Sequence, residues 1–427
     1  MLRTMSIASA VCLLALDALG QTPEDQEERI KQLEKKVEEL SRRLEESEQE
    51  RLVQDAEVEA AKAPAKAPEE RQFGEGALSL QRLNPEVSIS GDVVAALVLS
   101  GSRTYATEED RSGFILRGLG LHLQSMLDPY SLFKSAVHFG AEGVGLEELY
   151  VVWHGLVPNL SFWVGRFRQN FGVVNRWHEH ELDQIEHPLA LKLILGDEGL
   201  AGEGFGLRYL LPRLWAHANE LTLEVTNGTN EKLFSGKHFS IPTGLLHLKN
   251  YYDLSRSTYL ELGLTGVVGV NNRVGFLDGD RLRDEDWRLT YCLGADLTLY
   301  WSPPSKLRYQ SVTWRTEALY ADKQVEDGHT RAWGVYSYLQ WQPAERWFLG
   351  VRGDAVLPLD RESDKLTFDV VPWVTFWQSE FVYLRLEYRH GWRMPYEMAS
   401  GGLGRRTDDR VLLQVDFAAG PHKHEKY

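Results

Sequence analysis

The feature that most restricts the fold is an alternation of side chains from Leu289 to Trp301, LTYCLGADLTLYW. Every second residue, beginning with Leu289, is apolar or aromatic, whereas the residues between them are mostly small, polar or charged. Successive side chains of a strand point to opposite faces, so the stretch predicts a strand with one apolar face. Its 13 residues exceed the roughly 5–6 of an ordinary strand. A tilted strand of about 9–11 residues already crosses a bilayer.

The same pattern recurs through the last three-quarters of the chain and predicts about sixteen strands, an even number as in bacterial barrels. We expect them near residues 87–99, 113–127, 131–140, 146–155, 160–169, 202–211, 219–228, 243–253, 258–270, 287–301, 308–321, 331–341, 346–357, 364–376, 380–390 and 410–418.

The connections between these strands alternate in length. Short turns, such as 158–159 and 378–379, follow even-numbered strands, and long loops, such as 101–112 and 170–201, follow several odd-numbered ones. Periplasmic turns and longer outside loops alternate in this way in transmembrane barrels. The sequence therefore predicts an all-β, antiparallel transmembrane barrel over residues 85–420. A large soluble β-sandwich or propeller is the alternative, because alternation alone does not distinguish the two.

Composition supports the membrane barrel. The 427 residues include 13 Trp and 17 Tyr, and barrels carry such side chains in belts at both membrane interfaces. No run of 18 or more apolar residues follows the N-terminus, so we expect no transmembrane helix. The net charge of −15 argues against a nucleic-acid partner.

The N-terminal region divides into three segments. Residues 1–20 have the pattern of a secretory signal peptide, with an anchor helix as the alternative. Residues 24–58 carry apolar side chains at heptad spacing and predict a short coiled coil, with a lone solvated helix as the alternative. The Ala/Pro-rich residues 59–84 predict a spacer. The coiled coil, the spacer and the tail at 421–427 are expected in the periplasm, where the spacer could also contact peptidoglycan.

Charged residues of both signs share one face of several predicted strands. Such a face suits a wet interior, because Arg or Lys facing lipid costs up to about 2–4 kcal/mol each at the midplane. On the strand at 160–169 this assignment places Trp163 and Phe167 on the outside. The residues expected to line the pore are Arg166, Arg168, Arg208, Asp296, Arg315, Glu317, Arg352, Asp354, Arg385, Glu387 and Arg389. The alternative is that these charges brace a filled interior.

The long connection 170–201 is expected to fold inward and narrow the pore, because its apolar run from Leu189 to Leu195 is poorly suited to water. It also holds His178, His180 and His187 among four acidic residues. A His-x-His pair places both rings on one side of an extended backbone, which is a start for a Zn²⁺ site. The alternative is a polar constriction whose histidines bind carbonyl groups and water.

The chain resembles the outer-membrane porin superfamily that includes the phosphate-selective type O and P porins. The resemblance covers roughly residues 84–420. It rests on LNPEVSISGD at 83–92, on Gly165-Arg166-Phe167-Arg168 before Phe171-Gly172, and on the closing Gly420-Pro421-His422. Asn175-Arg176-x-His178-x-His180 is similar to a poorly characterised branch of such barrels in Gram-negative bacteria, some of which are labelled TonB-dependent or zinc-regulated receptors.

The resemblance implies a sixteen-stranded barrel, commonly trimeric, that passes small anions or other solutes; a dimer stays an alternative. The lysine-rich lining associated with phosphate selectivity is not evident here, and no plug-like domain precedes the barrel.

The function expected is therefore an outer-membrane channel for passive diffusion of small hydrophilic solutes or ions, and not an enzyme. No hydrolase elbow, zincin helix or phosphate-binding loop is found in the sequence. A zinc-related outer-membrane transporter or receptor, and a tether between the outer membrane and the cell wall, are the alternatives. No cofactor is expected apart from the zinc hypothesis.

Overall fold

The structure is a computed structural model that describes residues 86–420 except 102–111, 141–142, 228–229, 231, 235–240, 272–273, 279–280, 286, 307–308, 326–327, 360–365, 398–402. The chain divides into two compact units, residues 1–76 and 77–427, and only the second contains described residues. The signal peptide, coiled coil, spacer and periplasmic tail expected from the sequence lie outside the described residues.

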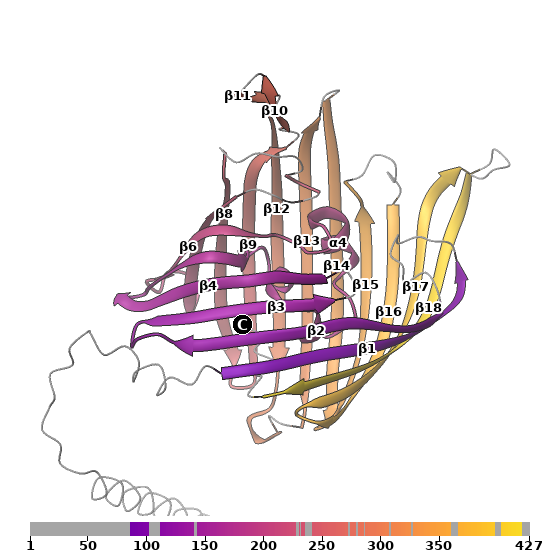
Figure 1. The fold of residues 1–427 in the computed structure, drawn as a ribbon. Coiled ribbons are helices and arrows are strands. Elements are labelled where there is room, and N and C mark those ends of the chain that lie inside the picture. Colours follow the sequence, from indigo (N-terminus) through magenta and orange to yellow (C-terminus); the bar gives the residue numbers. More distant parts are fainter. Residues whose placement is uncertain are drawn as a thin grey trace, which may run out of the picture. The chain divides into compact units, whose positions relative to one another are not determined.

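Sixteen antiparallel strands close into a barrel (Figure 1). Each strand pairs with its neighbours along the chain, and the first strand, β1, pairs with the last, β18. A separate two-stranded sheet, β10 with β11, lies between β9 and β12 in the chain. The strands are β1 (Glu86–Gly101), β2 (Gly113–Met126), β3 (Ser131–Gly140), β4 (Gly143–Val157), β5 (Leu160–Arg168), β6 (Ala201–Leu211), β7 (Ala218–Thr226), β8 (Thr243–Ser255), β9 (Thr258–Asn271), β10 (Val274–Asp278), β11 (Arg281–Glu285), β12 (Arg288–Trp301), β13 (Ser311–Val325), β14 (Gly328–Ala344), β15 (Trp347–Leu357), β16 (Leu366–Ser379), β17 (Val382–Glu397) and β18 (Leu403–Ala419).

The prediction of an antiparallel barrel with about sixteen strands is confirmed. Two regions differ in detail from the sequence-based ranges. The predicted loop 271–286 contains the β10–β11 hairpin, and the predicted loop 390–409 is largely an extension of β17 and β18. Both regions are held by backbone hydrogen bonds between paired strands, with one register shift between Arg393 and Tyr396 of β17, so they need no alternation of apolar side chains.

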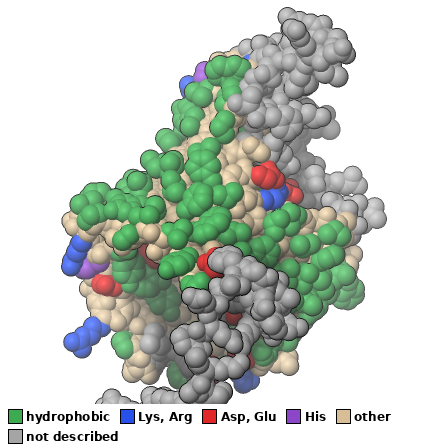
Figure 2. All heavy atoms as spheres, turned by 60° about the vertical axis from the view of Figure 1, so that its left-hand side comes forward, with side chains coloured by type: hydrophobic (Ala, Val, Ile, Leu, Met, Phe, Trp, Pro, Cys, Tyr) green, Lys and Arg blue, Asp and Glu red, His purple; other side chains and the backbone are tan. Residues whose placement is uncertain are grey.

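Strand β12 shows why the alternation specifies the barrel. Its apolar set faces outward, with Leu289 and Leu293 about half exposed, whereas Thr290, Cys292 and Asp296 on the other face are buried. Trp314, Trp333, Trp341 and Trp347 on the following strands are between 39% and 48% exposed. Figure 2 shows hydrophobic side chains spread over much of one described face. A closed sheet with an apolar exterior satisfies its backbone groups internally, as a lipid environment requires.

Two β-bulges change which side chains point inward. In β4, Leu146 lies opposite Val137 and Glu148 opposite Ala136, so Glu147 is an extra residue. In β2, Leu116 lies opposite Val93 and Gly118 opposite Asp92, so Arg117 is extra. A bulge re-aims the side chains around it, and both extra residues make contacts with the segment described below.

The helical elements are short. The connection between β5 and β6 holds the 3-10 turns η2 (Val174–Arg176) and η3 (Glu179–Glu181) and the helix α4 (Leu189–Leu195), and η4 (Pro304–Lys306) follows β12. Among the described residues, no helix has the length and apolarity needed to cross a membrane.

Candidate functional site

Residues 169–200, here called the inner segment, connect β5 to β6 and pack against the inward side chains of the barrel. Helix α4 lies against β14 and β15, as Figure 1 shows. Leu189, Ala190, Leu191, Ile194 and Leu195 of this helix are at most 4% exposed. The apolar run Leu189–Leu195, which the sequence shows to be poorly suited to water, is therefore buried between the inner segment and the barrel wall.

The apolar side chains of the inner segment form one cluster with the wall. The wall contributes residues from β8 through β16, including Leu245, Val267, Tyr336 and Trp373. This side of the barrel interior is consequently filled by side chains and has the character of a protein core.

Charged groups of the wall bind the inner segment through its backbone. Arg385 donates from Nη2 to the Leu182 carbonyl oxygen at 2.8 Å and from Nη1 to that of Gln184 at 2.9 Å. Arg352 donates to the Glu186 carbonyl oxygen at 3.1 Å. Arginine suits this task because its planar fork presents several donors in fixed directions.

Carboxylates of the wall accept hydrogen bonds from the segment's backbone in the same region. Glu317 Oε1 accepts from the N–H groups of Val173 and Val174, both at 3.0 Å. Gly172, just before them, has a φ of +59°, and a Cβ there would collide with the Glu317 carboxylate. The close approach of backbone and carboxylate thus requires glycine at this position.

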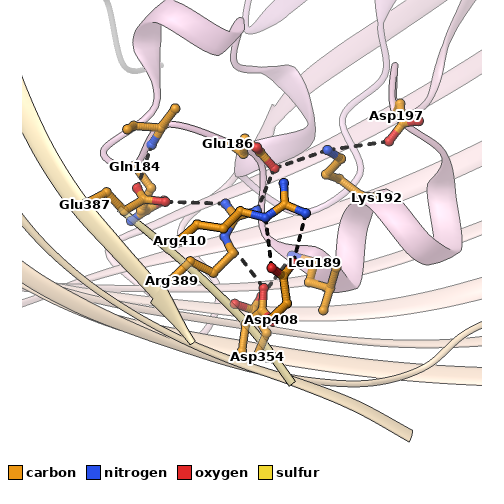
Figure 3. A network of polar contacts seen from close by, with 12 residues as sticks. Gln184, Glu186, Leu189, Lys192, Asp197, Asp354, Glu387, Arg389, Asp408 and Arg410 are labelled. Atoms are coloured by element: carbon orange, nitrogen blue, oxygen red, sulfur yellow. Dashed lines mark hydrogen bonds and ion pairs between the residues drawn. The ribbon is translucent and has the colours of Figure 1, made fainter. Parts of the chain in front are cut away.

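Figure 3 shows the ionic part of these contacts. Glu186 of the inner segment lies 3.0 Å from Arg389 Nη1 of the wall and 3.3 Å from Lys192 Nζ. Arg389 also contacts Glu387 at 3.3 Å, and the Leu189 N–H donates to Asp354 at 2.9 Å. Burial opposes ionisation of Glu186, but Arg389 and Lys192 hold the pKa of its carboxyl well below the usual value.

Eight of the residues expected to line the pore are buried in the structure. None of the eight is more than 7% exposed, and none lines the cavity described next. The pore-lining role of these eight residues stays a prediction, and the alternative is that they brace a filled part of the interior. They are Asp296, Arg315, Glu317, Arg352, Asp354, Arg385, Glu387 and Arg389.

Open space lies on the other side of the inner segment. A cavity of about 450 Å³ is bounded by β1–β6 and by the first part of the segment. Lys134, Arg168, Arg176 and Arg208 contribute positive charge to its lining, and Glu86, Glu148 and Glu181 contribute negative charge. Tyr150, Trp163 and Phe167 provide aromatic surface.

Three residues of β5 lie on other faces than the sequence suggests. Trp163 and Phe167 are 5% and 2% exposed and line the cavity, whereas Arg166 does not and pairs with Glu203 at 2.7 Å. Arg166 lies across from the outward Leu149 in the strand register. The aromatic side chains point inward because the interior has its own aromatic patch. Arg168 and Arg208 border the cavity, and their role as pore-lining residues stays a prediction.

His178 is held between two consecutive glutamates. Its Nδ1 lies 2.6 Å from Glu147 Oε2 and its Nε2 lies 3.1 Å from Glu148 Oε2. Both carboxylates reach it because Glu147 is the extra residue of the β4 bulge. Burial would lower the pKa of His178, but the two carboxylates raise the pKa to about 10, so the ring is a cation at neutral pH.

The predicted histidine group divides in the structure. The rings of His178 and His180 stack with centroids 5.7 Å apart, and His122 of β2 lies 4.8 Å from the His180 ring. His187 lies elsewhere and donates from Nε2 to the Trp177 carbonyl oxygen at 3.1 Å. Burial lowers the pKa of His187 to about 4, so this ring is neutral at neutral pH.

The zinc hypothesis stays a prediction. Within the described part of the chain, no group of three or more His, Cys, Asp or Glu side chains is arranged to hold a metal ion. Both nitrogens of His178 already face carboxylates, so a metal would have to displace one of them.

Three residues of this region, Glu147, His122 and Tyr150, were not predicted as site residues from the sequence. The Glu147-Glu148 pair interrupts the alternation of β4 and was a usable signal for the bulge. His122 and Tyr150 reach the cavity only because of strand register and closure, which alternation within a single strand does not reveal.

Comparisons with known proteins agree with this architecture. No family model matches the chain. An uncharacterized protein of Aquifex aeolicus is 25% identical over 346 residues, with 75% of this chain and 72% of that protein covered.

Among solved structures, the outer membrane channel DcaP of Acinetobacter baumannii has a TM-score of 0.51 at 12% identity, with 79% of this chain and 97% of that chain covered. An anion-selective porin from Comamonas acidovorans has a TM-score of 0.51 at 12% identity, covering 78% and 99%. OprB of Pseudomonas putida has a TM-score of 0.50 at 10% identity, covering 81% and 97%. At these identities the likeness shows a shared fold.

Proposed function

We propose that the protein is an outer-membrane channel for the passive diffusion of small hydrophilic solutes, narrowed by its inner segment. The observation that supports this is the asymmetry of the barrel interior. The inner segment packs against one side, and an open cavity with charged lining remains on the side of β1–β6. A barrel of this strand number is wide enough to leave an aqueous path when it is partly filled.

The apolar exterior supports a place in the outer membrane, with the N-terminal segment in the periplasm. We also include a homo-oligomer in the proposal, with a trimer favoured. A Vibrio cholerae outer membrane protein solved in a trimer form has a TM-score of 0.50 and 9% identity to this chain.

Conductance in planar lipid bilayers tests the proposal. Purified full-length protein should insert and give discrete, ohmic current steps. Replacing residues 172–198 by a short Gly/Ser linker should raise the current of each step, because the filled side of the interior becomes water.

The matched control replaces residues 274–285, which carry the β10–β11 hairpin, by a linker of the same kind. It alters a long connection outside the main barrel sheet, and its current steps should equal those of wild type. If folded wild-type protein at high concentration gives no current steps, the proposed channel function is wrong. Equal steps in wild type and the shortened inner segment would overturn the constriction.

A further inference from the structure

We propose that the cavity beside the inner segment is a saturable binding site for a small carboxylate that carries a planar ring, such as an aromatic carboxylate. This inference rests on the proposed channel function, for which it names a class of solute. It comes from the side chains that meet at one end of the cavity, where two arginines and an indole lie together.

The two arginines converge on one neutral acceptor. Arg176 Nη1 of the inner segment lies 2.8 Å from Asn170 Oδ1, and Arg208 Nη2 of β6 lies 3.3 Å from the same oxygen. Two guanidinium groups that share an acceptor repel each other. An anion entering the cavity reduces this repulsion and offers both groups a charged acceptor, which makes stronger hydrogen bonds than a neutral amide.

Two carboxylates close to these arginines lie outside the cavity lining. Glu220 contacts Arg208 through Nε at 3.2 Å, and Glu224 accepts hydrogen bonds from Asn170. Neither borders the open space. Elsewhere in the lining, Glu148 and Glu181 border the cavity and interact with His178, and Arg168 lies 3.8 Å from Glu147 in the same group. The Arg176–Arg208 pair is thus the cationic part of the lining beside Asn170.

Aromatic surface adjoins the arginine pair. The Arg208 guanidinium lies 5.5 Å from the centre of the Trp163 ring, and Phe167 packs edge-on against that ring with centroids 5.9 Å apart. Tyr150 lies next to Phe167 at 6.3 Å. A flat ring gains from contact with such a patch through apolar burial and offset stacking. A carboxylate held by the arginines would place an attached ring against this patch.

The size of the site fits a small solute. The cavity of about 450 Å³ lies within the roughly 300–1,000 Å³ of small-molecule sites. Wholly hydrated ions would leave the aromatic patch unused, and a neutral ring would leave the arginines unused. The combination of both surfaces selects a molecule that has a charge at one end and a ring at the other.

Calorimetric titration of folded, full-length protein in detergent tests the binding without reference to conduction. The probes are benzoate, acetate, benzamide and benzylammonium, which separate charge from ring. Benzoate should bind with a saturable isotherm, and each of the others should bind at least about tenfold more weakly, because each lacks one of the two interactions or reverses the charge. Equal affinity for benzoate and benzamide, or for benzoate and acetate, would overturn the proposal.

Variants locate the site. Arg176→Gln and Arg208→Gln should each weaken benzoate binding at least about tenfold. Arg166→Gln is the matched control, since Arg166 is a nearby arginine on the outward face of β5, and it should bind benzoate as wild type does. Circular dichroism confirms that each variant is folded. If a variant does not fold, the probe series on wild type still decides whether charge and ring are both required.

Bilayer recordings separate this inference from the function on which it rests. A channel that also binds should show benzoate currents that saturate with concentration and a reduction of chloride current by benzoate. Conductance without any preference for benzoate overturns the binding site and leaves the channel intact. Binding in the calorimeter without conductance overturns the channel, and with it the assignment of this carboxylate class as a transported solute.

Discussion

At the scale of single residues, His178 has a surrounding that its sequence context did not predict. The sequence offers it as a zinc ligand, which stays a prediction, and the structure places it between Glu147 and Glu148. Removing the ring would leave two partly buried carboxylates without their shared partner. Breaking a fully buried ion pair in this way costs about 3–5 kcal/mol, and we expect a smaller loss here because Glu147 is partly exposed. The first prediction concerns this group.

We expect His178→Ala to lower the urea midpoint of the barrel in lipid vesicles and to change its pH dependence. The folded-state pKa of about 10 lies above the ordinary value of about 6.5. The stabilising contribution of His178 is therefore complete below pH ~6.5 and is lost as the pH rises through the folded-state pKa. Wild type should lose stability over this window, and the variant should lose less.

The matched control for this prediction is His154→Ala. His154 also lines the cavity, but it forms a hydrogen bond with the neutral Ser161 hydroxyl at 2.9 Å. The urea midpoint of His154→Ala should change with pH between pH 6.5 and 10 as the urea midpoint of wild type does. An unchanged slope in His178→Ala would show that the two carboxylates do not hold a charged ring.

His187 should act at the acid end. Its folded-state pKa is about 4, below the ordinary ~6.5. The unfolded chain therefore binds a proton first, and stability contributed by this residue falls as the pH drops from ~6.5 towards 4. His187→Gln keeps an N–H donor for the Trp177 carbonyl and removes the titration. Its urea midpoint should decline less than that of wild type between these pH values, and parallel curves would contradict the assignment.

At the scale of elements, the inner segment depends on the directions of hydrogen bonds from the wall. Arg385 makes four hydrogen bonds, two of them to the segment: Nε donates to Thr375, Nη1 to Gln414 and to the Gln184 carbonyl, and Nη2 to the Leu182 carbonyl. A lysine keeps the charge but cannot place donors along all of these directions.

Arg385→Lys should therefore loosen the inner segment without opening the barrel. We expect a loss of about 1–3 kcal/mol in unfolding free energy, the cost of leaving buried acceptors unsatisfied. Single-channel records should show increased open-channel noise at nearly the wild-type mean current. Arg331→Lys is the control, because Arg331 is an exposed residue of β14 that pairs with Asp322. Equal open-channel noise in Arg385→Lys and Arg331→Lys would show that the noise does not arise from a loosened inner segment.

The elements also show what alternation in a sequence can and cannot predict. Strand β12 was expected at 287–301 and is found at Arg288–Trp301, because its two faces meet such different surroundings. Strand β5 was placed correctly, but Trp163 and Phe167 point inward and not outward, since the interior beside this strand carries aromatic as well as charged side chains. Register is specified only where the two sides differ in polarity.

The candidate site was predictable only in part for the same reason. The inward course of residues 170–201 follows from their apolar run, and two of the predicted pore-lining residues, Arg168 and Arg208, border the cavity in the structure. Arg208 lies 38 positions from Asn170 in the sequence and Arg176 lies 6 positions from it, so their convergence depends on how β6 and the inner segment meet in space. No pattern within a single strand encodes such a contact.

At the scale of the whole molecule, the chain divides at residue 76 into two units. If the barrel alone conducts, deleting residues 24–72 should leave the current steps unchanged, with the same strand-dominated circular dichroism spectrum. A tether would instead lose its association with peptidoglycan, which co-sedimentation with purified cell wall measures. Loss of current steps in the folded deletion variant would show that conduction depends on the N-terminal unit.

The pairing of β1 with β18 also constrains the order in which the chain acquires its structure. The inner segment follows β5 in the chain, and several of its polar partners lie much later, on β13 to β17. Contacts between residues so distant in sequence form slowly, because a long loop must close before any of them is made. We therefore expect these contacts of the segment to form late in folding, after those with the neighbouring strands β4 and β6. Until then the leucines of α4 lack their partners on β14 and β15, so a periplasmic holding factor would have most to protect in this interval.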